Sequence, residues 1–264
     1  MSEEIMKALI FSIMPKKKIC DEYVFLNRTY IYRPLWTYIA EERKSLITLV
    51  FFSTNQGRYT EGNSWTGISW SRFYIWDKIQ LNFLEKYNSI KAKYYQFNYI
   101  PMCDDYNISH IPYSDICIFD DAPLSLLHTA LYGQIDSNYN FNCRLSFFDD
   151  ILEIASKYNL SINFKIKRET KSIHKGYLKK IKNSKYKKIQ LIDANVAPKR
   201  VIEKSKLVIS YPFSTTGLIA KNFAKEVIYY SPHDIDDSFK VYTRDIKTIF
   251  NKINLEYFIK SKFN

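Results

Sequence analysis

The sequence predicts an α/β fold built on a parallel sheet, and three observations lead to this class. From residue 115 onward, short β-prone apolar runs alternate with helical patterns in the order β-α-β-α-β-α-β-α-β. This spacing is typical of βαβ units, the Rossmann-like class. The run 116–119 is apolar without a break, as in a strand that is covered on both faces. With 264 residues, the chain has room for one large domain or two small ones.

Hydrophobic periodicity places the individual elements. Helix 147–158 carries Phe148, Ile151, Leu152 and Ala155 on one face at a spacing of 3.6 residues, and Pro198 suits the first turn of helix 198–204. The predicted strands are 7–13, 47–52, 73–76, 115–119, 162–166, 188–192, 206–210 and 226–230. The predicted helices are 35–43, 77–86, 147–158, 173–182, 198–204 and 216–224.

Two domains follow from this order. Residues 89–264 carry the regular alternation, and ligands of such sheets bind outside the carboxyl ends of the strands. Residues 1–88 repeat the α/β character less regularly. Their stretch 57–67 holds three of the six glycines and is typical of an exposed loop.

The charge of the chain is concentrated in one segment. Lys and Arg total 39 and Asp and Glu 27, a formal net charge of +12. Segment 160–206 holds 15 basic and 3 acidic residues, a net of +12, so the rest (24 basic, 24 acidic) is neutral. A local basic field of this kind indicates an anionic partner: a nucleic acid, a phosphorylated metabolite or an anionic membrane face.

Several chemistries lack support in the sequence. Neither a glycine-rich dinucleotide fingerprint nor a P-loop occurs, the cysteines form no C-x-x-C pair and the histidines no zinc motif, and no serine lies in G-x-S-x-G. The Asp-Ile-Asp at 234–236 is too short to indicate a metal by itself. We therefore expect no cofactor and no metal. Isolated cysteines and an acidic N-terminus favour a cytoplasmic chain without a signal peptide.

The most informative local feature is the stretch 208–220, in which a buried strand runs into Pro212, a Ser/Thr cluster and an apolar helix. Ser214 or Thr215 suits the N-cap of that helix. The N–H groups and the positive dipole end of a helix start favour phosphate binding, and the hydroxyls of Ser214, Thr215 and Thr216 add donors. The alternative is an N-cap without a ligand.

This stretch resembles the "PFTS motif" proteins of surface polysaccharide biosynthesis and, more broadly, the sugar-nucleotide half of GT-B glycosyltransferases. The similar segments are Pro212-Phe213-Ser214-Thr215-Thr216, Ile219-Ala220, 225–232, 147–152, 164–168, 201–210, 51–55 and 74–76 with Gln80. The two hydroxyl residues of the family tetrapeptide Pro-Phe-Thr-Ser are exchanged here, and Ser231 stands where the family has Asp.

The resemblance implies an enzyme that transfers a sugar from a nucleotide-activated donor to a glycan or lipid-linked acceptor in capsule or O-antigen synthesis. GT-B enzymes use two facing Rossmann-like domains. Residues 89–264 would be the nucleotide-sugar domain, and residues 1–88 the distal part of an incomplete acceptor-side domain, which commonly supplies the general base. A truncated enzyme, half of a split enzyme that a partner chain completes, and a remnant all stay open, and no general base is assigned.

The resemblance also implies the donor site. Pro212, Phe213, Ser214, Thr215 and Thr216 would hold the phosphate or the sugar of the donor.

Two further predictions come from strand ends that face the expected ligand. Lys165 lies at the end of strand 162–166, and Lys167 and Arg168 follow it; the resemblance implies that they offset charge on the leaving group, the alternative being a solvated basic loop. Asp120 follows strand 115–119, where a carboxylate could bind a metal or act as a base. The resemblance implies instead that it faces the cleft, and the remaining alternative is a turn and helix cap.

A different class of function stays open beside this one: a non-catalytic basic module that binds nucleic acid or an anionic membrane through segment 160–206. Such a nucleic-acid face interleaves basic residues with exposed aromatics, and Tyr177 and Tyr186 are the only aromatics in 171–188. The remaining lysines of the segment are expected on outward helix faces, where they would orient the protein toward the inner face of the cytoplasmic membrane.

Overall fold

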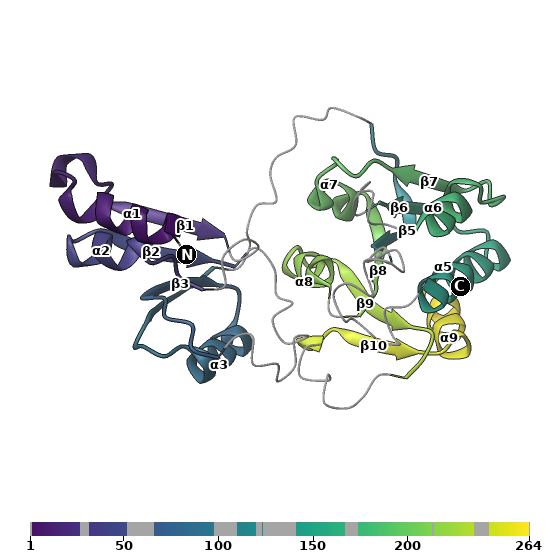
Figure 1. Cartoon of the computed structure of the whole chain (residues 1–264). Coiled ribbons are helices and arrows are strands. Elements are labelled where there is room, and N and C mark those ends of the chain that lie inside the picture. The colour runs from purple at the N-terminus through teal and green to yellow at the C-terminus, as the bar shows by residue number, and fades with distance from the viewer. Residues whose placement is uncertain are drawn as a thin grey trace. The chain divides into compact units, whose positions relative to one another are not determined.

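The computed structural model describes residues 2–26, 32–51, 66–97, 110–119, 123, 141–166, 174–212, 214–234 and 243–263. The chain divides into two compact units, Met1–Ile100 and Pro101–Asn264, which are hereafter unit 1 and unit 2 (Figure 1). Each unit is an α/β structure around a wholly parallel sheet, which confirms the predicted class.

Unit 1 contains a four-stranded sheet in the order β1-β2-β3-β4. Its elements are α1 (Ser2–Ile13), the 3-10 turn η1 (Lys16–Lys18), β1 (Glu22–Leu26), α2 (Trp36–Glu42), β2 (Leu46–Val50), β3 (Arg72–Ile75), α3 (Lys78–Tyr87) and β4 (Lys93–Gln96). The strands follow one another in space as they do in sequence.

Aromatic rings fill the core of unit 1. Phe25 of β1 lies between Trp36 and Trp70, with ring centroids 5.9 and 5.2 Å away. Phe73 of β3 stacks on Tyr94 of β4 at 5.3 Å. Such pairs add to the free energy gained by burying apolar surface.

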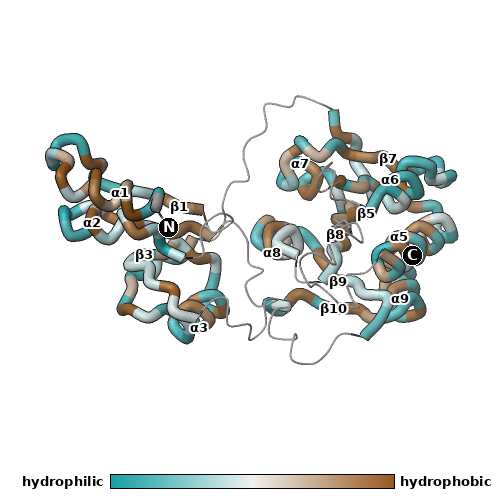
Figure 2. The backbone as a smooth tube through the Cα atoms, in the orientation of Figure 1, coloured by the Kyte–Doolittle hydropathy of each residue, from teal (hydrophilic) through white to brown (hydrophobic). Residues whose placement is uncertain are grey.

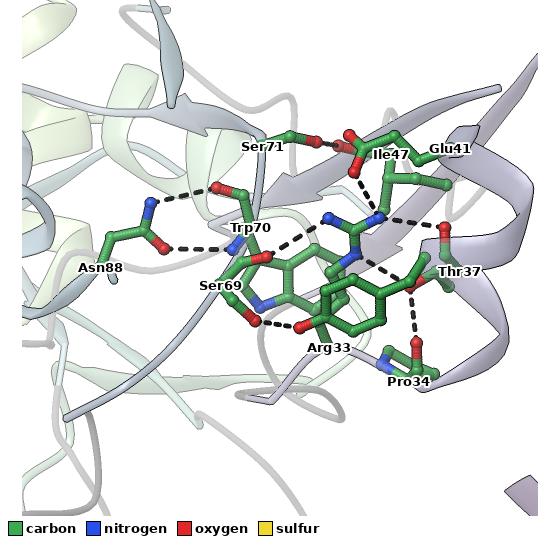
Figure 3. Close-up of polar contacts among 10 residues, drawn as sticks. Arg33, Pro34, Thr37, Glu41, Ile47, Ser69, Trp70, Ser71 and Asn88 are labelled. Carbon is green, nitrogen blue, oxygen red and sulfur yellow. Dashed lines mark hydrogen bonds and ion pairs between the residues drawn. The ribbon is translucent and has the colours of Figure 1, made fainter. Parts of the chain in front are cut away.

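A buried arginine joins α2 to the segment that leads into β3 (Figure 3). The Arg33 guanidinium donates to Thr37 Oγ1 at 2.9 Å, to the Thr37 carbonyl at 3.0 Å and to the Ser69 carbonyl at 3.3 Å. Glu41 completes the set with an ion pair of 2.7 Å. Because a buried charge is costly unless it is paired, this network explains how Arg33 can lie inside the unit.

Unit 2 contains a six-stranded sheet in the order β10-β9-β8-β5-β6-β7. Its elements are β5 (Ser114–Phe119), α5 (Phe141–Lys157), β6 (Ile162–Lys165), α6 (Lys175–Lys182), β7 (Ile189–Ile192), α7 (Pro198–Glu203), β8 (Ser205–Ser210), α8 (Thr215–Asn222), β9 (Glu226–Ser231), β10 (Lys247–Phe250) and α9 (Lys252–Phe263). The chain adds strands on one side of β5 and then crosses to the other side at β8. This is the doubly wound order, and β5 and β8 flank its topological switch point.

The core of unit 2 lies along the central strands, whose middles are hydrophobic in Figure 2. Ile116, Ile118, Leu207 and Ile209 are wholly buried there. Helix α5 lays Phe147, Phe148, Ile151 and Ile154 against them at helical spacing. None of the helices in the described ranges is both long and apolar enough to cross a membrane.

The predicted strand 7–13 is wrong, because these residues lie in helix α1. Glu4, Ala8 and Phe11 are its less exposed positions, and their spacing is helical. The Phe11 ring packs on Trp36 at 4.5 Å, so this stripe faces α2.

The strands β1, β4 and β10 were not predicted. Each is an edge strand with exposed positions. β4 and β10 lack the unbroken apolar run by which the central strands are recognised, whereas β1 contains the apolar run 23–26 and was overlooked. Because β4 pairs with β3, unit 1 extends past residue 88.

Candidate functional site

The candidate site lies where β5 and β8 end, beside the switch point of the unit 2 sheet. Phe119 and Ser210, the last residues of these strands, are paired, and the Tyr211 N–H donates to the Phe119 carbonyl at 3.1 Å. The chain then passes Pro212 and enters α8 at Thr215, with Ser214 as the N-cap residue. The predicted phosphate-binding stretch is thus placed at the sheet edge where open α/β sheets bind ligands.

Three hydroxyls meet at the start of α8. Ser210 Oγ lies 3.0 Å from Thr216 Oγ1, Ser214 Oγ lies 2.9 Å from Thr216 Oγ1, and Ser210 and Ser214 are themselves in hydrogen-bond contact. The Ser214 side chain therefore points into this hydroxyl cluster and makes no cap hydrogen bond to the helix. Ser210 is buried, whereas Ser214 and Thr216 are half-buried. A hydroxyl can both donate and accept, so the cluster can turn donors toward an anion.

Thr215 differs from its two neighbours. Its side chain is buried, whereas those of Ser214 and Thr216 are half-buried. Of the predicted residues, Pro212, Ser214 and Thr216 are brought together with Ser210 at the sheet edge, while Thr215 begins the helix behind them. Sequence reasoning missed Ser210 because it was counted as the end of a strand.

Strand β9 holds the start of α8 in position. The Tyr229 hydroxyl donates to the Ser214 carbonyl at 3.0 Å. A Cβ atom on Gly217 would lie 2.5 Å from Cε1 of the same tyrosine ring, closer than real Cβ contacts. Gly217 is thus needed for the close approach of Tyr229, and the approach fixes where Ser214 and Thr216 stand.

A buried layer of polar and aromatic side chains supports Tyr211. The Arg144 guanidinium lies over the Tyr211 ring, 3.4 Å from its centroid, and Phe147 meets the same ring edge-on at 5.3 Å. Arg144 is fully buried in the first turns of α5. The sequence offered no signal for it, since a lone arginine in a helix is ordinarily exposed.

The same layer contains a carboxyl–phenol pair. The Tyr230 hydroxyl donates to Asp150 Oδ2 at 2.5 Å. Burial raises the pKa of Asp150, although the hydrogen bond from Tyr230 opposes this, and burial followed by the same bond raises the pKa of Tyr230. Both groups are more readily neutral than they would be in water, which suits an internal hydrogen bond.

Lys165 ends β6 in the same row of the sheet as the site. It is paired with Phe119, which is paired with Ser210, so the Cα atoms of Lys165 and Ser210 are about 10 Å apart. The side chain is buried, and its Nζ donates to the carbonyls of Ile166 at 2.7 Å and Ala194 at 2.9 Å. Lys165 therefore ties two loops of the carboxyl edge together while placing a positive charge behind them.

The other predicted residues lie outside the described ranges: Asp120, Lys167, Arg168 and Phe213. Their predicted roles stay predictions.

The lysine-rich stretch of unit 2 shows the surface expected of it. Lys175, Lys179, Lys180, Lys182, Lys185, Lys187 and Lys188 are all exposed. Tyr177 is buried, and the Tyr186 hydroxyl turns inward to the carbonyls of Leu160 and Ala155. Within 174–188 the structure thus presents exposed cations without an exposed aromatic.

Comparison with known proteins agrees with the fold and with the motif. The model of a family described as "Polysaccharide biosynthesis PFTS motif protein" matches residues 1–256. Among curated proteins, none matches the chain in sequence.

Two solved structures are similar in fold. The crystal structure of TarM aligns with a TM-score of 0.51 and 11% identity, over 99% of this chain and 51% of TarM. The UDP-GlcNAc 2-epimerase of Methanocaldococcus jannaschii aligns with a TM-score of 0.53 and 14% identity, over 99% of this chain and 75% of the epimerase. The chain thus spans about half the length of TarM, and the likenesses support the predicted GT-B-like class.

Proposed function

The chain belongs to the family of polysaccharide biosynthesis PFTS motif proteins, and from this premise we propose that it is a glycosyltransferase of surface polysaccharide synthesis. It would transfer a sugar from a nucleotide-activated donor to a glycan or lipid-linked acceptor, as in capsule or O-antigen assembly. The observation that carries the proposal is the hydroxyl cluster of Ser210, Ser214 and Thr216 at the switch point of the unit 2 sheet.

The start of α8 suits the phosphates of such a donor. Helix N-termini present N–H groups and the positive end of the helix dipole to an anion. The Ser214 and Thr216 hydroxyls add neutral donors beside them, and the buried Lys165 adds positive charge to the same sheet edge. We further propose that Asp120, Lys167, Arg168 and Phe213, which adjoin these strand ends in sequence, contribute to the same site.

The proposed reaction is a displacement at the anomeric carbon of the donor sugar. The acceptor oxygen forms a bond to that carbon, the bond from the carbon to the phosphate oxygen breaks, and the electron pair leaves with the nucleotide phosphate. Preorganised donors and cations stabilise the charge that develops on this leaving group. The acceptor proton passes to a base that we expect from the acceptor side, supplied by unit 1 or by a partner chain that completes it.

The proposed compartment is the cytoplasm, with peripheral contact at the inner face of the membrane for lipid-linked acceptors. Cys117 and Cys143 are buried and Cys20 is exposed, and all three are free thiols, which suits a reducing environment.

Donor binding tests this function. A panel of UDP-, GDP- and dTDP-activated sugars is titrated calorimetrically into the wild type, a Ser214→Ala/Thr216→Val variant and a Ser156→Ala control, whose serine is exposed on α5. Hydrogen bonds to charged groups contribute about 1.5–3 kcal/mol each, so the double variant is expected to bind at least ~10-fold more weakly than the control. Equal affinity in all three proteins, or binding by none, contradicts the proposal.

The non-catalytic basic module remains the second candidate, supported by the exposed lysines of 174–188. Its nucleic-acid form predicts binding to DNA of any sequence with a steep dependence on salt. The inward positions of Tyr177 and Tyr186 deprive this stretch of base-stacking platforms, and for that reason we place glycosyl transfer first.

A further inference from the structure

Helix α1 of unit 1 has an apolar outer face. The stripe Glu4, Ala8 and Phe11 faces α2, as the 4.5 Å contact of Phe11 with Trp36 shows. On the opposite side the exposed large hydrophobic residues are Ile5 (46%), Met6 (59%), Leu9 (55%), Ile10 (45%) and Ile13 (83%). At 100° per residue these five span an arc of about 140° that contains no charged side chain. An outward helix face is ordinarily polar, so this one indicates a surface that meets an apolar partner.

Three lysines follow α1 in the sequence after two residues. Lys16, Lys17 and Lys18 form η1 and are exposed, and no described acidic side chain forms an ion pair with them. The acidic residues of α1 are engaged elsewhere: Glu3 and Glu4 pair with Lys7, and the Glu4 carboxylate also accepts from the Leu35 N–H. The charge that is left available beside the apolar face is positive.

We propose that the outer face of α1, together with Lys16–Lys18, docks unit 1 onto an anionic lipid bilayer. An apolar helix face that lies flat with lysines at its border matches the boundary between acyl chains and headgroups, where apolar area and anionic lipids act together. The C-terminal part of α1 is held in place on the other side, since the Arg43 guanidinium donates to the Phe11 carbonyl at 2.6 Å. A protein partner or a second copy could pack on the apolar face alone, and the three adjoining lysines therefore favour an anionic bilayer.

This surface is distinct from the lysines of segment 160–206, and it does not rest on the proposed donor site. Docking requires neither Ser214 nor Thr216, so the two proposals can fail separately.

Vesicle binding of the full chain tests the inference. Co-sedimentation is measured with extruded vesicles of phosphatidylcholine alone and of phosphatidylcholine mixed with phosphatidylglycerol. We expect binding to the mixed vesicles that weakens with added salt. Leu9→Asp/Ile13→Asp is expected to reduce it at least ~10-fold, because it places charge on the exposed face that would enter the bilayer. Lys16→Gln/Lys17→Gln is expected to reduce it by about fivefold per lysine.

The matched control is Ile253→Asp/Tyr257→Asp, which changes two exposed large hydrophobic residues of α9 in unit 2 and should bind as the wild type does. Far-ultraviolet circular dichroism checks that each variant is folded. Failure of the wild type to bind the mixed vesicles, or wild-type binding by the α1 variant, overturns the proposal. So does a dimer in sedimentation equilibrium that only the α1 variant converts to monomer, since the face would then join two copies.

Discussion

The two sheets of this molecule are both wholly parallel, yet they are buried to different extents. The central strands of unit 2 have few exposed positions: β6 is buried throughout, and β5 and β8 each have one residue that is not. In unit 1, the central strand β2 is buried only in its middle, β3 alternates half-buried and buried positions, and the edge strand β1 alternates exposed and half-buried ones, with Val24 and Leu26 exposed. Only a strand covered on both faces needs a continuous apolar sequence. The doubly covered sheet carries the proposed donor site, whereas the exposed apolar groups of unit 1 belong to the less covered sheet and to the proposed docking helix.

Shortening a buried side chain in a central strand of unit 2 is expected to have the largest effect on stability. Ile118→Ala removes a wholly buried side chain from β5 and is expected to lower the opening free energy of the β8 amides by about 2–5 kcal/mol. Val24→Ala changes an exposed residue of β1 and is expected to shift the β2 amides by less than about 0.5 kcal/mol. Native-state hydrogen exchange measures both. Similar losses in the two variants would mean that Val24 is packed as tightly as Ile118, contrary to its exposure.

The packing of Gly217 against Tyr229 should give the next largest effect. Gly217→Ala places a Cβ against the tyrosine ring, and we expect a loss of about 1–3 kcal/mol in the free energy of unfolding together with weaker donor binding. Urea unfolding and donor titration measure the two effects. Gly176→Ala is the control, because its nearest contact would be 3.1 Å, to a histidine side chain rather than a core ring. Unchanged donor binding in Gly217→Ala would show that the position of the α8 start does not matter for donor binding.

Removal of the Lys165 ammonium tests whether the carboxyl edge depends on it. Lys165→Met leaves the carbonyls of Ile166 and Ala194 without this donor, at an expected cost of about 1–2 kcal/mol in unfolding free energy. Donor affinity is expected to fall as well, because a positive charge leaves the sheet edge. If stability falls and donor affinity does not, Lys165 is a structural residue only.

The smallest effect concerns pH. Burial raises the pKa of Asp150 in the folded state above the ordinary 3.8, so the folded state binds this proton more tightly than the unfolded chain does. Stability should therefore fall as pH rises from the unfolded pKa through the folded one, and this slope should be shallower in Asp150→Asn. Urea unfolding at a series of pH values above 3.8 measures it. A steeper slope in the variant would show that the Tyr230 hydrogen bond outweighs burial.

Much of the candidate site was predictable because its signals are local. A buried strand followed by Pro212 and a row of hydroxyl residues predicted the turn into α8, and Ser214 and Thr216 do lie there together. The contribution of Ser210 could not be foreseen, because its hydroxyl meets theirs only when the helix folds back over the strand end. Nor could Arg144, whose place over Tyr211 depends on how α5 crosses the sheet.

The class of the fold and the central strands of unit 2 follow from the amino-acid pattern alone, because strands that are covered on both faces consist mostly of apolar residues. The sequence also contains the hydroxyl stretch that resembles the family motif. The helix at 7–13 and the strands β1, β4 and β10 became evident from the packing of the folded chain, because these elements are partly exposed and their conformation follows from what they pack against. The exposure of the apolar face of α1 is likewise a result of tertiary packing. Phe11 packs on Trp36, and the opposite face of the helix is exposed.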